Sequence, residues 1–464
     1  MPAHLLRLIA APWRRLVAGW ALRRLRLRHP AQLVVLAFAL LILLGTALLV
    51  LPVATPGPTS APPLTALFTA TGAACGALAA VDTATYWSRF GQLVILGLLQ
   101  VGGFGIMTLA SLLGLIAFRR LGLRQRLAAL AETGALSLGE VRRVLVSVAC
   151  FTLLFEAATA TVLTVRLATA YMEPPGRAVW LGVFHAVSAF NNAGYTLYRD
   201  NLAGFVTDPW VTLAVAVAII TGGIGFPVLL ELWRLPQAPR RWSLHTKLTL
   251  LMTALLLTAG TLAVLAFEWA NPATLGPLDV PGKLLAGFFQ AVTPRTAGFN
   301  TLDYGSMRET TWLVTDILMF VGAGSASTAG GIKVTTFALL ALVIWAEARG
   351  NPAVTLFGRR IPDAAQRQAL TVALIGLGAV VAGTLALMAT DPLPLSRVLF
   401  EAFSAFGTAG NSTGITPQLQ PFGQQILIAL MFLGRVGPLT LGAALALRER
   451  ERLYRFPEER PIVG

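Results

Sequence analysis

The chain has 464 residues, of which 56% are hydrophobic and only 12% charged, and its mean hydropathy is +0.71. Soluble proteins carry about 25% charged residues, so this composition excludes an ordinary soluble domain and indicates an integral membrane protein. The net charge of +15 could suggest a nucleic-acid partner, but most Lys and Arg residues lie in five stretches that alternate with apolar runs. This is the positive-inside pattern of an even number of spans with both termini cytoplasmic, so we expect a multi-pass protein of the cell membrane, surrounded by the lipid bilayer, with no nucleic-acid partner.

The apolar runs, such as 34–53 and 93–118, are continuous and therefore predict helical spans, since the strands of a membrane barrel would alternate. They form four units with one layout, namely a long apolar helix, a short loop element and a second long apolar helix. A repeat of about 110 residues predicts an all-α membrane protein in which eight transmembrane helices and four filter loops surround a central pore. The predicted organisation is a basic amino-terminal segment 1–30, repeats 31–118, 144–233, 246–346 and 368–446, cytoplasmic loops 119–143, 234–245 and 347–367, and a cytoplasmic tail 447–464.

The loop elements share a sequence. Phe184-His185-Ala186-Val187-Ser188-Ala189-Phe190-Asn191-Asn192-Ala193-Gly194-Tyr195 has close relatives at 289–299 and 400–411 and an eroded copy at 68–78. Each is too short to span a bilayer and ends in small residues with a glycine. Ordinary loops between hairpin helices are the alternative, but three near-copies at equivalent places favour pore helices that lead into a filter.

A filter must replace the hydration shell of a cation by protein oxygens, and a ring of backbone carbonyls does so without fixed charge. Glycine adopts the backbone dihedrals that turn successive carbonyls inward, and the negative carboxy-terminal end of each apolar helix favours a cation. The predicted ion-binding residues are Cys75, Gly76, Asn191, Asn192, Ala193, Gly194, Arg295, Thr296, Ala297, Gly298, Gly407, Thr408, Ala409 and Gly410.

The second helix of each unit contains a glycine cluster, at 101–105, 221–225, 322–333 and 434–438. Close packing of helices explains the first two clusters. The third is small, polar or charged at eleven of its twelve positions. Because irregular backbone exposed to lipid is excluded, we expect residues 322–333 to break the helix and to line a water-filled path.

Five ionisable residues lie within apolar segments. Arg435 is expected to face the interior, near the filter carbonyls or the broken helix, because an unpaired arginine at mid-membrane costs about 2.5–3.5 kcal/mol. Lys333 either limits cation entry below the filter or extends to the inner interface, with equal weight. Glu156 and Asp316 are proton carriers or, as we favour, structurally paired carboxylates, and His185 is expected to be a packing residue. No phosphate-binding loop is present, and we expect no enzymatic activity.

With these residues in view, nearly the whole chain resembles the TrkH/KtrB/HKT superfamily of potassium and sodium translocating subunits, and the KtrB branch above all. The most specific pieces lie at 188–195, 293–301, 327–333, 404–416 and 434–440. The resemblance implies K⁺ uptake through four non-identical repeats, a homodimer, and cytoplasmic nucleotide-binding regulatory subunits of the KtrA or TrkA type. The nucleotide is then bound by that partner, and this chain holds no cofactor besides the transported ion. It also implies a gate, held closed with the help of Arg435, that comprises Gly324, Ser325, Ser327, Thr328, Gly330, Gly331 and Lys333.

The first repeat departs from the family pattern, which resembles Cys-Val-Thr-Gly-Leu. Here Cys75-Gly76-Ala77-Leu78 is shorter by about one residue, and Gly76 is the best candidate for the filter glycine. This departure leaves the choice between K⁺ and Na⁺ open. Two alternatives to a channel-like K⁺ translocator therefore remain. One is a Na⁺-coupled, proton-coupled or Na⁺-permeable transporter with a midplane site, and the other is a non-conducting structural subunit.

Overall fold

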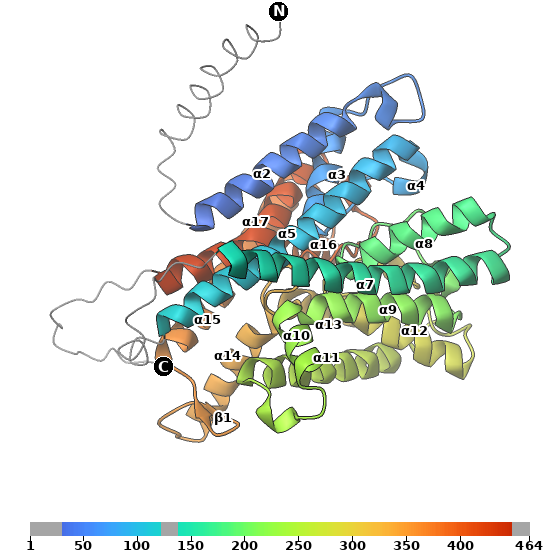
Figure 1. Ribbon diagram of the computed structural model, residues 1–464. Coiled ribbons are helices and arrows are strands. Elements are labelled where there is room, and N and C mark those ends of the chain that lie inside the picture. The colour runs from blue at the N-terminus through green and yellow to red at the C-terminus, as the bar shows by residue number, and fades with distance from the viewer. Residues whose placement is uncertain (1–29, 122–137, 448–464) are drawn as a thin grey trace, which may run out of the picture.

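The computed structural model describes residues 30–121 and 138–447 and is almost entirely α-helical (Figure 1). The predicted amino-terminal segment, the centre of the first cytoplasmic loop and most of the predicted tail lie outside the described residues. Within the described ranges the chain forms four successive units, and each consists of a long helix, a short helix, a loop and a second long helix, as expected from the sequence.

The bounds of the helices follow this layout. Unit 1 comprises α2 (Pro30–Leu49), α3 (Pro63–Cys75), α4 (Thr83–Tyr86) and α5 (Arg89–Leu121). Unit 2 comprises α7 (Leu138–Ala170), α8 (Pro175–Phe190), α9 (Pro209–Ile224) and α10 (Phe226–Arg234). Unit 3 comprises α11 (Leu244–Glu268), α12 (Val280–Val292), α13 (Glu309–Val321) and α14 (Val334–Ala348). Unit 4 comprises α15 (Asp363–Thr390), α16 (Leu395–Gly407) and α17 (Pro421–Leu447), and a hairpin of β1 (Thr355–Leu356) and β2 (Arg359–Arg360) precedes it.

The short helices α3, α8, α12 and α16 are the predicted pore helices. They have 13 to 16 residues. At 1.5 Å per residue they are about 20–24 Å long, which is less than the hydrocarbon core of a bilayer. Their carboxy-terminal halves are buried, so each one enters the centre of the protein and ends there.

Among the described helices, four are long and apolar enough to cross a membrane: α5, α7, α11 and α15. The pair α9 and α10 adds a fifth span that is bent by 98°. This bend corrects the expectation that the second glycine cluster serves helix packing alone. Gly222 does pack against the carbonyl oxygen of Phe190, but Gly225 has φ +98° and ψ 147°, which glycine alone adopts readily, and it ends α9.

The four units close into a ring. Helix α5 contacts α7 and α8, α9 contacts α12, α13 contacts α16, and α17 returns to contact α2 and α3. Figure 1 shows this closure where the red α17 lies beside the blue α2. The repeat that was inferred from the sequence is therefore a pseudo-fourfold arrangement around one axis, with the pore helices inside it.

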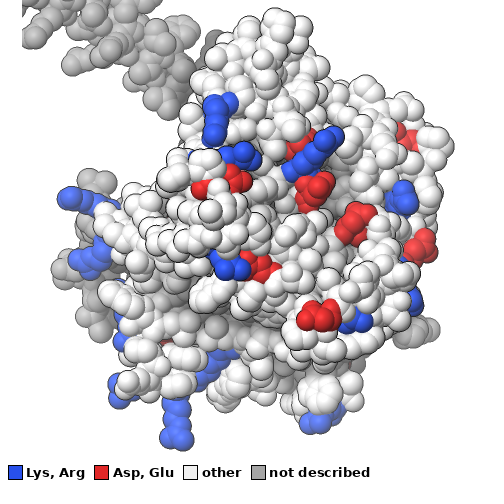
Figure 2. Space-filling view, turned by 90° about the vertical axis from the view of Figure 1, so that its right-hand side faces the viewer, with Lys and Arg blue, Asp and Glu red and all other residues white. Residues whose placement is uncertain are grey.

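One end of the molecule carries the loops that lead into the pore helices. Figure 2 looks onto this end, where acidic side chains gather near the middle of the face with Lys and Arg side chains among them. Two buried acidic residues organise these loops. Glu268 accepts four hydrogen bonds at the end of α11, and Asp208 caps the first turn of α9.

Candidate ion-conduction site

The loop after each pore helix turns sharply at residues with positive φ. In units 2 to 4, two such residues flank an alanine, and this alternation lets successive carbonyls point to the same side of the segment. The pairs are Asn192 and Gly194 (φ 52° and 70°), Thr296 and Gly298 (both 69°), and Thr408 and Gly410 (50° and 82°). The segments predicted as the filter in these three units therefore share one backbone conformation.

The first unit has only the first of these two turns. Gly76 (φ 65°, ψ 59°) caps α3 as Thr408 (φ 50°, ψ 42°) caps α16. The following amides confirm the match, because those of Ala77 and Ala409 both donate to the carbonyl five residues earlier, at 2.9 and 2.8 Å. Gly76 is thus equivalent to Thr408, and the expectation that it replaces the missing filter glycine is wrong.

Leu78 stands where the other units have a filter glycine, two positions after the first turn. Its φ is not positive and its side chain is fully buried. The first segment therefore enters the ring through Ala77 and Leu78, without the second left-handed residue. The expected shortening by about one residue is wrong as well, since Leu78, ten positions after Phe68, is the counterpart of Gly194 and Gly410, which lie ten positions after Phe184 and Phe400.

The four segments meet backbone to backbone. A Cβ added at Gly298 would lie 3.0 Å from the Cα of Gly194 and 3.2 Å from that of Gly410. One added at Gly410 would lie 3.3 Å from the carbonyl oxygen of Ala77, and one at Gly76 would lie 2.7 Å from a carbonyl oxygen of unit 2. The contacts run from each unit to the next and close the ring. Side chains larger than hydrogen do not fit at the glycines of this ring.

Four of the predicted ion-binding residues precede the ring. Cys75 and Gly407 are the last residues of α3 and α16, and Asn191 caps α8. The side-chain Nδ2 of Asn191 donates to Glu156 of α7 at 2.9 Å, behind the segment. Arg295 lies in the turn between α12 and the third segment. These residues support the filter segments from outside the ring.

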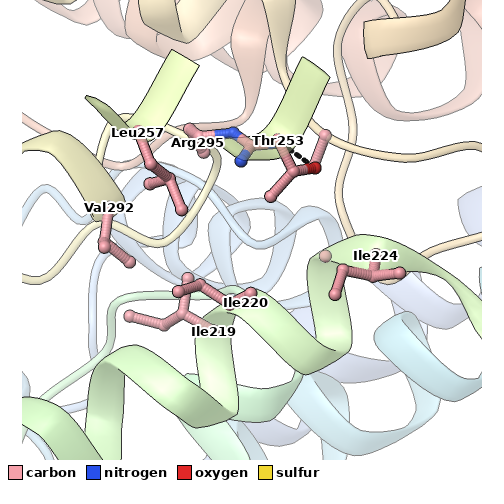
Figure 3. Close-up of a pocket in the computed structure, with 9 residues that line it drawn as sticks. Ile219, Ile220, Ile224, Thr253, Leu257, Val292 and Arg295 are labelled. Carbon is pink, nitrogen blue, oxygen red and sulfur yellow. Dashed lines mark hydrogen bonds between the residues drawn. The ribbon is translucent and has the colours of Figure 1, made fainter. Parts of the chain in front are cut away.

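Arg295 points away from the ring. Its guanidinium is buried, and it donates to the carbonyl of Gly322 at 3.4 Å and to Oγ1 of Thr253 in α11 at 3.3 Å (Figure 3). It borders a cavity of about 10 Å³, which is room for about one water molecule. The cavity is lined by Ile219, Ile220, Gly223, Ile224, Thr253, Leu257, Val292, Arg295 and Ala323. Arg295 therefore connects the third filter segment to the first residue of the loop 322–333.

The loop 322–333 breaks the second span of unit 3, as predicted. Gly322 ends α13 with φ 57° and ψ −139°, and α14 begins only at Val334. The loop contacts unit 2 directly, because the amide of Gly324 donates to the carbonyl of Gly223 at 2.8 Å and the hydroxyl of Thr328 donates to that of Phe190 at 3.0 Å. Phe190 is the last residue of pore helix α8, so the loop lies at the inner end of the filter.

The same loop also contacts unit 4, which links it to unit 1. The amide of Gly331 donates to the carbonyl of Gly434 at 3.1 Å, and a Cβ at Gly331 would lie 3.1 Å from the carbonyl oxygen of Gly407. Arg435 is 2% exposed and donates to the carbonyls of Thr328 and Gly102, the latter at 3.4 Å. The loop consequently crosses beneath the ring, touches units 2 and 4, and is linked to unit 1 through Arg435.

Lys333 turns back onto the loop that it terminates. Its Nζ donates to the carbonyls of Ala329 at 2.6 Å and Gly330 at 3.2 Å. The alternative that Lys333 extends to the inner interface is therefore wrong. Two serines among the predicted gate residues also bond locally, Ser325 to Thr335 at 3.0 Å and Ser327 to the Gly324 carbonyl at 2.6 Å.

The buried carboxylates differ from one another. Glu156 is bonded to the amides of Gln100 and Asn191 at 3.2 and 2.9 Å, with no cation beside it among the described residues. Asp316 is buried and its Oδ1 has no hydrogen-bond partner within the described part of the chain, so the expectation of a paired carboxylate is wrong there. Glu401 of α16 and Tyr195 are not among the site residues predicted from the sequence. Their signal was the position each holds in the repeated segments.

Comparisons with known proteins agree with this architecture. The family model described as "TrkH: Cation transport protein" matches residues 13–452. The chain is 43% identical over 436 residues to the Ktr system potassium uptake protein B of Bacillus subtilis, covering 94% of this chain and 97% of that protein. It is 36% identical to the protein of the same name from Vibrio alginolyticus (93% and 94% covered) and to the potassium/sodium uptake protein NtpJ of Enterococcus hirae (95% and 99%).

The fold also matches a solved structure, the crystal structure of the potassium transporter TrkH from Vibrio parahaemolyticus. The TM-score is 0.70, and the match covers 90% of this chain and 84% of that one at 17% sequence identity. Identity at this level shows the shared fold, which is that of an all-α, multi-pass membrane protein. With the family match along nearly its whole length, the chain belongs to the TrkH family of cation transport proteins, a family of transporters rather than enzymes.

Proposed function

We propose that the chain is a channel-like subunit that mediates K⁺ uptake across the cell membrane. The observation that carries the proposal is the closed ring of four backbone segments at the ends of four buried helices. Carbonyls in such a ring replace the hydration shell of K⁺, and the helix ends add negative potential. The printed names of the relatives, which are potassium or potassium/sodium uptake proteins, support the choice of ion.

The loop 322–333 acts in this proposal as the gate. It crosses beneath the ring, and Arg435 ties it to α5 of unit 1 through the Gly102 carbonyl. The gate opens when the contacts of the loop with units 2 and 4, including the one from Arg435, are released. Lys333, which is bonded to two loop carbonyls, stabilises the closed arrangement rather than filtering ions at an entrance.

The proposal also includes the topology and the assembly. The chain crosses the plasma or inner membrane eight times with both termini cytoplasmic, and the domain boundaries are those inferred from the sequence. It forms a homodimer on cytoplasmic regulatory subunits of the KtrA or TrkA type, and these partners bind the nucleotide. Support comes from the basic stretches between the units and from the similarity to Ktr system proteins.

A Na⁺-permeable translocator is the second candidate. It is favoured by the first segment, where Leu78 lacks the positive φ of the glycines in the other three units, and by the Enterococcus hirae relative. A ring in which one of the four filter segments has a different backbone conformation discriminates less sharply between K⁺ and Na⁺, which differ in radius. A non-conducting structural subunit has no comparable observation in its favour.

Expression in cells that lack their own K⁺ uptake systems tests the proposed function. The chain together with its regulatory subunit should restore growth at low external K⁺ and should support ⁸⁶Rb⁺ uptake. Growth and uptake that remain at the level of cells with an empty vector, although the protein is inserted, would contradict it. Uptake of ²²Na⁺ at a rate comparable to that of ⁸⁶Rb⁺ would favour the second candidate.

A further inference from the structure

One position of the pore helices is polar and buried in every unit, and the conduction mechanism above does not use it. It is the residue directly after the phenylalanine that begins each repeated segment. Its occupants are Thr69, His185, Gln290 and Glu401, and none is more than 2% exposed. A buried polar side chain requires partners, so the same position in four units calls for a common explanation.

In unit 4, Glu401 holds the loop that leaves the filter. Its carboxylate accepts hydrogen bonds from the hydroxyl of Ser412 at 2.6 Å, the amide of Thr413 at 3.0 Å and the hydroxyl of Thr416 at 2.8 Å. Ser412 lies two residues after Gly410. The carboxylate thus joins the pore helix before the filter segment to the chain that follows it.

In units 2 and 3 a different side chain at this position joins the pore helix to the chain that follows the filter segment. Nδ1 of His185 donates to a carbonyl of its own helix at 2.7 Å, which leaves Nε2 to accept from the hydroxyl of Thr196 at 2.9 Å and from the amide of Leu197 at 3.3 Å. Nε2 of Gln290 donates to the carbonyl of Leu302 at 3.4 Å. In all three units a partner lies 11 or 12 positions further along the chain, and Glu401 has a further partner, Thr416, at 15 positions.

Unit 1 differs, because Thr69 is too short to reach its outgoing loop and its hydroxyl has no partner among the described residues. The hydroxyl of Tyr195, which follows Gly194 in unit 2, lies 3.3 Å from the carbonyl oxygens of Thr69 and Leu78 and donates to them. A side chain of the neighbouring unit therefore joins the two ends of the first filter segment.

We propose that His185, Gln290 and Glu401 are positioning residues of the selectivity filter, and that Tyr195 fills this role for unit 1. We call these four side chains the loop anchors. None of them touches the ion. Each fixes the two ends of a filter segment and so sets the width of the carbonyl ring, on which discrimination between K⁺ and Na⁺ depends. The inference rests on the proposed function and adds residues that determine its ion selectivity.

Substitution of Glu401 gives the first test, with Glu268 as a matched control. Glu268 is equally buried and accepts four hydrogen bonds, but it belongs to α11 and not to a pore helix, and its partners in unit 3 beyond the filter, Arg308 and Thr311, lie ten or more positions after Gly298. The ratio of ⁸⁶Rb⁺ to ²²Na⁺ flux is measured in liposomes with the purified full-length protein. Glu401→Leu should lower this ratio about five-fold or more, because the outgoing loop loses all of its hydrogen bonds to the carboxylate, whereas Glu401→Gln should keep most of it. Glu268→Leu should lower thermal stability and leave the ratio unchanged.

His185 and Tyr195 give the second test. His185→Gln supplies the side chain that unit 3 uses, so it should preserve the flux ratio, while His185→Leu should lower it. Tyr195→Phe keeps the ring and removes one hydroxyl, so it should fold and should lower the ratio at least two-fold. This variant decides the question if the leucine variants do not fold. A wild-type ratio in Tyr195→Phe, or an equal loss in the Glu268 control, would overturn the inference. A wild-type protein without K⁺ flux would instead refute the proposed function.

Discussion

The guanidinium of Arg435 donates one hydrogen bond to the carbonyl of Thr328 in the loop 322–333, and a second, at 3.4 Å, to the carbonyl of Gly102 in α5. Arg435 belongs to unit 4, Thr328 to unit 3 and Gly102 to unit 1, so this side chain connects three units below the filter ring. A buried arginine without a carboxylate beside it is costly in a membrane, and the loop carbonyl offsets part of that cost. The closed position of the loop and the buried charge therefore stabilise each other.

Arg435→Ala should raise the K⁺ flux that is seen without a regulatory subunit, because the loop loses its hydrogen bond to unit 4 and its link to unit 1. The flux is measured as ⁸⁶Rb⁺ entry into proteoliposomes. Arg177→Ala, at an exposed ion pair with Glu173, is the control and should change nothing. Removal of part of 324–331 should have the same sign as Arg435→Ala. A fall in flux in both variants would mean that the loop supports the filter instead of obstructing it.

Gly298→Ala should reduce the preference for K⁺. The added Cβ meets the backbone of both neighbouring segments at 3.0 to 3.2 Å, and an alanine at φ 69° costs about 1–2 kcal/mol. The ring must then widen or distort, which changes the ratio of ⁸⁶Rb⁺ to ²²Na⁺ uptake by about five-fold or more. Gly378→Ala in α15, where a Cβ meets nothing within 4 Å, is the control and should transport as the wild type does. An unchanged ratio in Gly298→Ala would show that ions do not pass through this ring.

Glu156→Gln should leave K⁺ uptake largely intact. The amide has the shape of the carboxylate and keeps hydrogen-bonding capacity toward Gln100 and Asn191, which lie at 3.2 and 2.9 Å. In a channel-like protein this carboxylate only supports the second filter segment from behind. In a proton-coupled transporter it would carry the coupling proton, and the same substitution would abolish uptake. Initial ⁸⁶Rb⁺ uptake rates with and without a pH gradient separate the two outcomes.

Asp208→Asn should destabilise the protein at neutral pH. Burial alone would raise the pKa of Asp208, but hydrogen bonds from Arg166 (2.8 Å), Tyr171 (2.9 Å) and the amide of Trp210 (2.9 Å) outweigh it and hold the pKa below its ordinary value of 3.8. The charged form therefore stabilises the fold by about 2 kcal/mol above the ordinary pKa, and this contribution is lost as the pH falls through the lower folded-state pKa.

Thermal unfolding in detergent checks this prediction. The unfolding temperature of Asp208→Asn should lie below that of the wild type at pH 7, and the difference should begin to shrink as the pH falls below about 4. Glu173→Gln, which removes the partner of an exposed arginine, should have little effect at either pH. A difference between Asp208→Asn and the wild type that persists unchanged at pH 3 would contradict the assignment of the stabilisation to the Asp208 charge.

The sequence was sufficient for the four-unit layout, the pore helices and the break at 322–333, because apolar length and glycine-rich composition are local properties. It was not sufficient for the register of the first filter segment. By composition its one glycine, Gly76, suits either turn, and only the hydrogen bond from Ala77 shows that Gly76 makes the first turn and that Leu78 takes the glycine position. The bend at Gly225 was missed because Gly222 and Gly223 also serve helix packing, so one cluster has two roles.

Side-chain contacts between units could not be predicted from the sequence either. Its place before Thr296 predicts that Arg295 is a filter residue. The orientation of its side chain depends instead on the space between α9 and α11, where its guanidinium donates to Thr253 and to the Gly322 carbonyl. The sequence predicts that His185 is a packing residue, yet its Nε2 is hydrogen-bonded to Thr196 and Leu197, eleven and twelve positions later. That spacing becomes meaningful only when the outgoing loop is seen to fold back on the pore helix.

The central claim is that ions cross the membrane through the ring of the four filter segments and that this ring prefers K⁺. The most direct measurement is the reversal potential of the purified protein, with its regulatory subunit, in a bilayer with K⁺ on one side and Na⁺ on the other. The claim predicts a large reversal potential, negative on the K⁺ side, that moves toward zero in Gly298→Ala. A wild-type reversal potential near zero, or one that Gly298→Ala leaves unchanged, would contradict it.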